Sequence, residues 1–411
     1  MKFDDILIYA ICYFGLLTSI YFLVTLIQNR HKIIDKPLDF FPVVSVIVPA
    51  YNEEHTIIKT LHSLVNLKYA KDKLDIIVVD DGSTDNTLTI AKTFAGSHKN
   101  ISVLHKKNGG KGSALNMGLK VARGEFVGAL DADSFVRPYT LMKLLSRFEN
   151  ENIVAVTPSL KVETPGNLLQ KLQYYEYIMG VFLRKIFAFL GSIHVTPGPF
   201  TIYRKSFFDT YGGYDENNLT EDIEIALRIQ KHDFEIENSV EAEVYTVTPR
   251  TFKGLLNQRI RWYTGFVENT LRYKSLFSRH HGNLGVFILP SAFLSVLLIL
   301  VTMVWSLYRL TDLTTQYILR VYTLGFDFWK LFEFHFDAFY INLNGATILS
   351  VITLCVGIAL FIIACRLAGE KIRLRLSYII YLFVYWLLFG FWWGVSCLYH
   401  VTGRKVVWGK T

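Results

Sequence analysis

The stretch IIVVDDGSTD, residues 76–85, decides the fold class of this chain. Its four leading residues are apolar and β-branched, which is typical of a short strand buried on both faces of a parallel sheet. The strand ends on Asp80 and Asp81, and the Gly-Ser-Thr-Asp sequence that follows predicts a turn into a helix. A buried strand, a polar turn and a helix together form the repeating unit of an α/β fold.

The same pattern recurs before and after this stretch. An apolar run at 43–48 leads into a helical pattern at 53–66, and further runs at 103–104 and 126–130 predict a third and a fourth strand. Strands that alternate with helices indicate a doubly wound sheet, in which ligands bind at the carboxyl ends of the strands. The acidic clusters follow such strand ends, and we therefore expect an active site at this edge of the sheet.

The chain as a whole is too apolar for an ordinary soluble enzyme. Of its 411 residues 51% are hydrophobic, and the mean hydropathy is +0.30. The net charge of +8 does not indicate nucleic-acid binding, because Lys and Arg accumulate on the cytoplasmic side of membrane spans. The four cysteines lie in apolar runs without the spacing of a metal site, and they predict neither a disulfide framework nor a metal centre.

Residues 6–28 form an almost uncharged run that is long enough to cross a bilayer, which requires about 20 residues. A secretory signal peptide is the alternative, but the run is long for one, and Asp4 and Asp5 stand where basic residues are usual. Arg30, His31, Lys32 and Lys36 follow the run directly. They place the N-terminus outside and the next segment in the cytoplasm.

Three further spans are predicted at about 285–307, 346–367 and 377–400. The basic loop between the last two, with Arg366, Lys371, Arg373 and Arg375, is expected on the cytoplasmic side. The last span would then place Arg404, Lys405 and Lys410 outside, against the same tendency, so the side of the C-terminus stays open. Residues 308–345 are rich in Phe and Tyr and carry Arg320, Asp327, Lys330 and Glu333, which is compatible with an external interfacial helix or a re-entrant segment.

These patterns divide the chain into three parts. Residues 1–36 form an N-terminal membrane anchor with its basic flank, 37–270 a cytoplasmic α/β domain, and 271–411 an interfacial segment followed by the C-terminal spans. Residues 167–190 are apolar but interrupted by charges, so they form either a core helix or, as we prefer, an amphipathic helix at the membrane face of the domain. Residues 263–283 are aromatic and basic and predict a second interfacial segment.

Asp131 and Asp133 flank one residue at the end of the fourth strand. Two carboxylates at this spacing can hold a hard divalent cation such as Mg²⁺ or Mn²⁺ against a diphosphate. The cation would stabilise the charge on a departing nucleoside diphosphate. Acidic turns are common without a metal, and it is the position at the carboxyl edge of the sheet that favours a site.

Three further groups complete the chemistry. Asp80 and Asp81 can cap a turn or bind a base or ribose, and Lys111, in a glycine-rich loop, is either a phosphate ligand or a solvated lysine. Asp222 is the candidate general base, although an acidic pair at a helix start can also serve as a cap. Arg261 offers a planar fork to phosphate oxygens and Trp262 a face for a sugar ring, whereas Gln258 and Arg259 could be solvated.

Taken in order, these motifs are similar to those of the processive family-2 glycosyltransferases, which synthesise cellulose, chitin, hyaluronan and poly-N-acetylglucosamine. The resemblance runs from about Val43 to Trp262. It rests on PAYNE at 49–53, DDGSTD at 80–85, NGGKGSALNMG at 108–118, DAD at 131–133, TED at 220–222 and QRIRW at 258–262.

The resemblance implies a GT-A fold, a nucleotide-sugar donor that is usually UDP-linked, and Mg²⁺ or Mn²⁺. The residues matched to the donor site are Tyr51, Glu53, Asp80, Asp81, Lys111, Asp131, Gln258 and Arg261. Asp133 would be the principal metal ligand with Asp131 beside it. Asp222 would be the base, and Glu221 and Trp262 would contact the acceptor.

The resemblance therefore implies an inverting hexosyltransferase in the cell membrane that extends a β-linked polysaccharide and exports it through its spans. Four spans are fewer than the cellulose-making members carry, and no cyclic-dinucleotide-binding domain is apparent. A single transfer to a lipid-linked acceptor is thus the alternative, and accessory membrane subunits or further copies of the chain are candidate partners. A catalytically silent membrane scaffold is the contrasting hypothesis, which the intact set of carboxylates disfavours.

Overall fold

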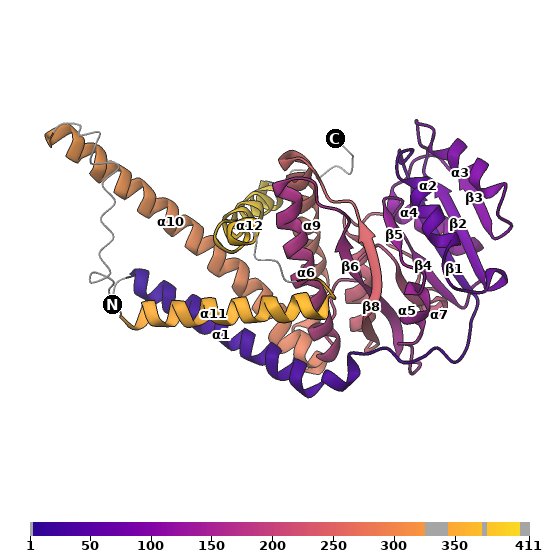
Figure 1. Cartoon of the computed structure of the whole chain (residues 1–411), viewed down its shortest axis with the longest axis horizontal. Coiled ribbons are helices and arrows are strands. Elements are labelled where there is room, and N and C mark those ends of the chain that lie inside the picture. The colour runs from indigo at the N-terminus through magenta and orange to yellow at the C-terminus, as the bar shows by residue number, and fades with distance from the viewer. Residues whose placement is uncertain (1–2, 325–343, 372–375, 403–411) are drawn as a thin grey trace.

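A mixed sheet of eight strands forms the centre of the domain (Figure 1). The computed structural model describes residues 3–324, 344–371 and 376–402. The strand order is β3-β2-β1-β4-β7-β6-β8-β5. The strands are β1 (Val44–Ala50), β2 (Leu74–Asp80), β3 (Ile101–His105), β4 (Phe126–Ala129), β5 (Ser134–Val136), β6 (Ile153–Val162), β7 (Thr201–Arg204) and β8 (Glu235–Thr246).

The first four strands pair in parallel, as the sequence predicts. Beyond β4 the sheet becomes mixed, because β7 pairs antiparallel with both β4 and β6, and β5 pairs antiparallel with β8. Only β6 and β8 continue the parallel pattern, with two irregularities in their register. The carboxyl ends of β1, β2 and β4 therefore lie at one edge, where the polar motifs follow them.

Helices cover both faces of this sheet. The helices of the domain are α2 (Ile57–Val65), α3 (Thr87–Ala95), α4 (Lys111–Val121), α5 (Thr140–Leu145), α7 (Lys205–Tyr211) and α8 (Glu221–Lys231). Alternate residues of β1 point to opposite faces: Val46 packs with α2, and Ile47 packs with α4. Gly118 of α4 allows the close approach, because a Cβ there would lie 2.5 Å from Ile47 Cγ2.

Two long helices separate the sheet from the apolar helices. The predicted segment at 167–190 is confirmed as one helix, α6 (Leu168–Phe189), and α9 (Phe252–Arg272) carries the QRIRW motif. On one side α6 contacts β6 and β8, and on the other it contacts the apolar helices α11 and α12. The expected interfacial segment at 263–283 is the end of α9 followed by two short 3₁₀ turns, Lys274–Leu276 and Arg279–His281.

Within the described residues, four helices are long and apolar enough to cross a membrane, and they contain the segments that the sequence predicts as spans. They are α1 (Phe3–Gln28), α10 (Leu289–Leu324), α11 (Gly345–Leu367) and α12 (Leu376–Thr402), with a π-helical turn, Leu284–Ile288, leading into α10. Tyr21 contacts Phe287, and Trp305 donates a hydrogen bond to Asp4, so α10 runs antiparallel to α1. The Cys12–Ser350 contact and the approach of Gly15 to Thr353 show that α11 runs parallel to α1.

The helix that contains the second predicted span, 285–307, continues beyond it, because α10 ends only at Leu324. Residues 308–324 contain neither Gly nor Pro, and threonine hydroxyls along this segment donate to carbonyls of the preceding turn. At 1.5 Å per residue the helix is about 54 Å long, well beyond a hydrocarbon core of about 30 Å. Its distal half extends away from the other helices (Figure 1).

Residues 325–343, 372–375 and 403–411, with Asp327, Lys330, Glu333, Arg373, Arg375, Arg404, Lys405 and Lys410, lie outside the described residues.

A buried ion pair ties the segment after α1 to the sheet. Arg147 and Asp35 are 6% and 8% exposed, and they form an ion pair. The same guanidinium donates to the carbonyls of Lys32 at 2.7 Å and Ile33 at 2.6 Å. Ser239 of β8 donates to the other oxygen of Asp35. The exit of the first span is thereby fixed to the domain.

Replacing Arg147 by Met should lower the free energy of unfolding by about 3–5 kcal/mol, because it leaves the Asp35 carboxylate buried without its cation. Thermal unfolding of the detergent-solubilised full chain measures this effect. Arg137→Met is the matched control. Arg137 is largely exposed and lies 3.7 Å from Glu243, so the expected loss is under about 1 kcal/mol. Equal losses of stability in the two variants would contradict a stabilising role of the Arg147–Asp35 ion pair.

Candidate active site

A cavity of about 1090 Å³ lies between the carboxyl edge of the sheet and the apolar helices. It brings together most of the residues that the sequence singles out, from six separate segments of the chain. The predicted residues that line it are Tyr51, Glu53, Asp81, Lys111, Asp131, Asp133, Glu221, Asp222, Gln258, Arg261 and Trp262. Asp80 is fully buried and is not part of the lining.

Lys111 lies at the centre of the charged part of the cavity. Its ammonium contacts Asp131 Oδ1 at 2.7 Å and Glu221 Oε1 at 2.9 Å, and so bridges the DAD and TED motifs. Burial alone would lower the pKa of Lys111, but the charges of Asp131 and Glu221 outweigh it and raise the pKa. The lysine is therefore a fixed cation and not a solvated surface residue.

The loop before Lys111 is shaped by Asp81. One oxygen of Asp81 accepts from the Gly109 amide at 3.0 Å and from Lys106 at 2.7 Å, and the other accepts from the Gly110 amide at 2.8 Å. Gly110 has a φ of +88°, a conformation that glycine adopts easily, and it directly precedes α4. Asp81 thus holds the turn that delivers Lys111 to the cavity.

Asp80 has different surroundings from its neighbour. One of its oxygens contacts His105 Nδ1 at 2.7 Å and accepts from the Ser83 amide at 3.3 Å, which stabilises the turn after β2. Its other oxygen is buried and has no hydrogen-bond partner among the described residues. A role of Asp80 in donor binding stays a prediction.

Gly198, in the Pro-Gly-Pro loop at 197–199, lies directly against the ammonium of Lys111. It lies between two prolines in the loop after α6, and a Cβ at this position would lie 2.6 Å from Lys111 Nζ and 3.3 Å from Asp131 Oδ2. The next turn is held by Phe200, a non-glycine residue with a φ of +62°. The Pro-Gly-Pro sequence was the available signal, because such a rigid loop with one small residue often marks a close approach.

The pKa values of two adjacent carboxyl groups at the start of α8 are shifted in opposite directions. Burial, followed by the charge of Glu221, raises the pKa of Asp222 to about 6. Burial also acts on Glu221, but Lys111 and Arg261 outweigh it and lower the pKa of that carboxyl. Glu221 is thus held as an anion, while Asp222 can accept a proton near neutral pH.

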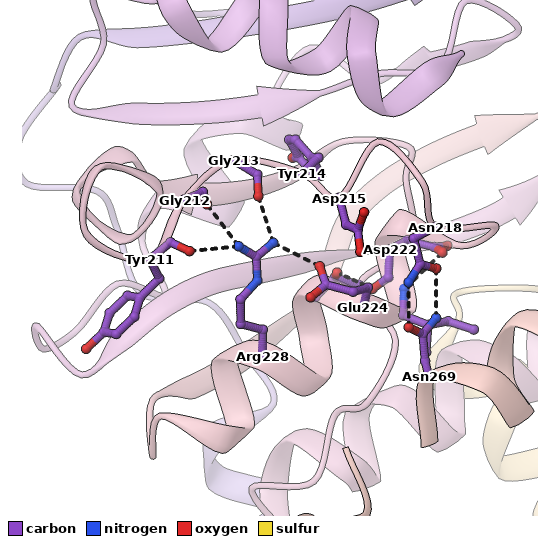
Figure 2. A network of polar contacts seen from close by, with 12 residues as sticks. Tyr211, Gly212, Gly213, Tyr214, Asp215, Asn218, Asp222, Glu224, Arg228 and Asn269 are labelled. Carbon is purple, nitrogen blue, oxygen red and sulfur yellow. Dashed lines mark hydrogen bonds and ion pairs between the residues drawn. The ribbon is translucent and has the colours of Figure 1, made fainter. Parts of the chain in front are cut away.

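A network of polar contacts fixes α8 (Figure 2). Arg228 donates to the backbone carbonyls of Tyr211, Gly212 and Gly213 at 2.8–3.0 Å and pairs with Glu224 at 2.9 Å. At the other end of the network, the amides of Asn218 and Asn269 exchange hydrogen bonds of 2.7 and 3.0 Å. The Asn218–Asn269 contact therefore fixes the start of α8, which carries Asp222, to α9. Arg228 fixes the last turn of α8 to the backbone at 211–213.

On α9 the QRIRW residues face different neighbours. Arg261 donates to the carbonyl of Leu219 at 3.3 Å, just before α8, and lines the cavity together with Gln258 and Trp262. Arg259, for which a solvated position was one alternative, is only 2% exposed and pairs with Glu176 of α6 at 2.6 Å. That alternative does not hold for Arg259, because α12 covers this face of α9.

The wall opposite the sheet comes from the apolar helices. Ser295 and Val296 of α10 and Phe389 and Trp393 of α12 line the same cavity as Asp222. The ring of Trp393 stacks on Tyr263 of α9, with 4.3 Å between the centroids and 4° between the planes. The sequence shows these residues only as parts of spans, so nothing in it assigns them to the site.

Known proteins resemble the part of the chain that builds this site. Residues 45–212 match the family described as Glycosyl transferase family 2. The poly-beta-1,6-N-acetyl-D-glucosamine synthase of Staphylococcus epidermidis is 32% identical over 247 residues, which cover 59% of this chain and 59% of that protein. Its counterpart in Staphylococcus aureus is 31% identical over 260 residues, or 62% of each chain. The chain thus spans about three fifths of the length of these curated relatives.

A solved structure shares the fold over nearly the whole chain. The mannosyltransferase from Pyrobaculum calidifontis, solved in complex with GDP-Man and Mn²⁺, superposes with a TM-score of 0.57. The match covers 97% of this chain and 100% of that chain at 18% sequence identity. At this identity the likeness concerns the fold, which is a GT-A domain joined to apolar helices.

Replacing Gly265 by Ala should lower the melting temperature by several degrees, because a Cβ on this residue of α9 would lie 2.2 Å from Thr220 Oγ1 and force α9 away from α8. Thermal unfolding in detergent measures the effect. Gly357→Ala is the matched control, because Gly357 also lies within a helix but has no atom within 4 Å of the added methyl group. A Gly265→Ala variant as stable as this control would contradict the close approach.

Proposed function

We propose that this chain, which carries a family-2 glycosyltransferase domain of the GT-A fold, transfers sugars from a nucleotide-sugar to a growing β-linked polysaccharide with inversion. The observation that carries the proposal is the single cavity in which Asp222, the Asp131–Lys111–Glu221 cluster and the QRIRW residues meet, with apolar helices as its far wall. Anionic, cationic and aromatic groups are thus placed together beside a membrane, as such a reaction requires.

In the proposed reaction an acceptor hydroxyl attacks the anomeric carbon of the donor sugar. The new C–O bond forms as the bond from that carbon to the β-phosphate oxygen breaks, and the hydroxyl proton passes to Asp222. A carboxylate with a pKa near 6 is ionised at neutral pH and still basic enough to take this proton. Glu221 stays anionic beside it and, with Trp262, would orient the acceptor.

The departing nucleoside diphosphate requires positive charge. Lys111 and Arg261 are cations of the cavity wall, and both act on Asp222 and Glu221 electrostatically. Asp131 and Asp133 supply hard oxygen ligands one residue apart on the same wall, a donor set that fits Mg²⁺ or Mn²⁺. A cation bound there would neutralise the charge that develops on the diphosphate.

The donor nucleoside is assigned to the part of the cavity lined by Tyr51, Glu53 and Asp81, at the ends of β1 and β2. Asp80 would act indirectly, by stabilising the turn after β2. The N-acetylglucosamine polymer named for the staphylococcal relatives makes UDP-N-acetylglucosamine the first donor to test.

The acceptor end of the cavity has features that suit a carbohydrate. Aromatic rings of Trp262, Tyr263, Phe266, Phe389 and Trp393 line it. Among the described residues, buried polar atoms of Gln258, Tyr263 and Trp393 have no hydrogen-bond partner, so they are available to sugar hydroxyls. Rings with polar edges bind sugars by stacking and hydrogen bonding together. This wall favours an extended saccharide as the acceptor.

A second candidate function is a single transfer to a lipid-linked acceptor. Ala292 and Val296 of α10 add apolar surface to the same wall, which would also suit a lipid chain. Product size separates the two functions: a high-mass product from purified protein supports the polymerase, and single-sugar adducts that require added lipid support the alternative.

The proposed location is the cell membrane with the catalytic domain in the cytoplasm. The basic residues at 30–32 lie at the domain end of α1, where the positive-inside tendency predicts the cytoplasm. If four spans are too few to form a channel for the polysaccharide, accessory membrane subunits or further copies of the chain would complete it.

Replacing Asp222 by Asn should reduce transfer at least about 10³-fold without changing donor binding, because it removes the base and keeps the shape. In the wild type, kcat/KM should fall about tenfold per pH unit below pH 6 and level off above it, because only the deprotonated carboxylate accepts the proton. Asp209→Asn, an exposed carboxyl on α7, is the control. Nucleotide release measured from pH 4.5 to 8 gives both results, and a retained rate in Asp222→Asn would exclude the assigned base.

Replacing Asp133 by Asn should raise the Mn²⁺ concentration for half-maximal activity by at least about tenfold, because one anionic ligand is lost. Electron paramagnetic resonance of Mn²⁺ with UDP reports the same loss without turnover. The Asp209→Asn variant again serves as the control. Unchanged Mn²⁺ binding would remove Asp133 from the metal site.

A further inference from the structure

The side chain of Arg259 joins three helices at the acceptor wall. Its Nη2 donates to Glu176 Oε2 of α6 at 2.6 Å, and the hydroxyl of Tyr385 of α12 donates to the same oxygen at 2.7 Å. Arg259 is 2% exposed and Tyr385 6% exposed, whereas the side chain of Glu176 is 25% exposed where it lines the cavity. A single carboxylate oxygen thereby links the QRIRW helix α9 to an apolar helix.

The same guanidinium lies against two indole rings. Its central carbon is 4.4 Å from the centroid of Trp262 and 5.7 Å from that of Trp392. A cation over an indole face is attracted by the ring, and the attraction is strengthened when the pair is desolvated. The acceptor platform Trp262 is therefore held by Arg259, three residues before it on α9.

Arg259 and Arg261 project from different sides of α9. Arg261 reaches the backbone before α8, whereas Arg259 reaches α6 and α12. A small rotation of α9 would therefore move both the Trp262 ring and the contact of Arg261 with the backbone before α8. The Glu176 contact on the other side limits such a rotation.

We propose that Arg259 is a positioning residue for acceptor binding, clamped by Glu176 and Tyr385 so that α12 fixes the orientation of the Trp262 indole. The inference rests on the proposed function, in which Trp262 carries the acceptor sugar. A general structural role would predict parallel losses of donor binding, acceptor binding and stability. A positioning role predicts a loss on the acceptor side only.

The test uses the purified full chain with UDP-N-acetylglucosamine, Mn²⁺ and a short β-linked N-acetylglucosamine oligosaccharide as the acceptor. Arg259→Lys keeps the charge but loses the flat stacking on Trp262. We expect the acceptor KM to rise about tenfold, with the donor KM and donor hydrolysis within about twofold of the wild type. Tyr385→Phe removes one hydrogen bond and should raise the acceptor KM about fivefold, in a variant that differs by a single oxygen atom.

Arg272→Lys is the matched control, because it is the same substitution on the same helix. Arg272 pairs with Asp215 on the surface and should tolerate the change without effect on either KM. A wild-type acceptor KM in Arg259→Lys and in Tyr385→Phe would overturn the inference. A parallel rise of both KM values with a lower melting temperature would overturn it too.

The two levels of the proposal fail in different ways. If the wild type transfers no sugar from a panel of UDP- and GDP-sugars and does not bind the oligosaccharide, the proposed function is wrong, and the role of Arg259 is excluded with it. If the wild type is active and the variants behave as the Arg272→Lys control, only the positioning role is excluded. Tryptophan fluorescence on addition of the oligosaccharide reports acceptor binding independently of turnover.

Discussion

The ammonium of Lys111, held between Asp131 and Glu221, is the interaction on which the arrangement of the site depends. A buried cation requires paired anions, and here the two anions come from the ends of different elements. The position of the lysine is in turn fixed by backbone features: Asp81 holds the turn before α4, and Gly198 leaves room above the ammonium. The charged centre therefore constrains the end of β4, the loop after α6 and the start of α8 together.

This constraint also explains why two adjacent carboxyl groups can differ. Glu221 contacts the ammonium of Lys111 directly, which lowers the pKa of that carboxyl, whereas burial and then the charge of Glu221 raise the pKa of Asp222. In the proposed reaction, a diphosphate brings negative charge to Lys111, and a divalent cation brings positive charge to Asp131. The original ion pair can thus be exchanged for two new contacts without a large change in net charge, so the closed cluster need not obstruct substrate binding.

The sequence predicts the part of this molecule that depends on local pattern. The apolar strands at 76–79 and 126–130 end on acidic residues, the strand at 43–48 leads into PAYNE at 49–53, and the rules of doubly wound sheets place these ends at one edge. It does not distinguish Asp80 from Asp81, because side chains alternate at the end of a strand, and the register decides which one faces the cavity. Nor does the sequence decide whether Arg259 is solvated or buried, because its burial depends on α12, more than 100 residues later in the chain. The length of α10 was also missed, since composition marks where a span becomes less apolar, not where its helix ends.

The cavity divides into halves of different chemistry, and each half suits the environment that builds it. The sheet edge supplies carboxylates, backbone amides and Lys111, which can be held in place only by a rigid domain with its own core. The helices α9, α10 and α12 supply aromatic rings and small polar atoms, which can lie beside a bilayer without large desolvation costs. Asp222 lies where the two halves meet, because α8 packs against the sheet on one side and against α9 on the other. In the proposed reaction, Asp222 would act as the base at this boundary, with charged groups on one side and aromatic rings on the other. The division of the fold between domain and membrane helices therefore corresponds to the division of the proposed reaction between donor and acceptor.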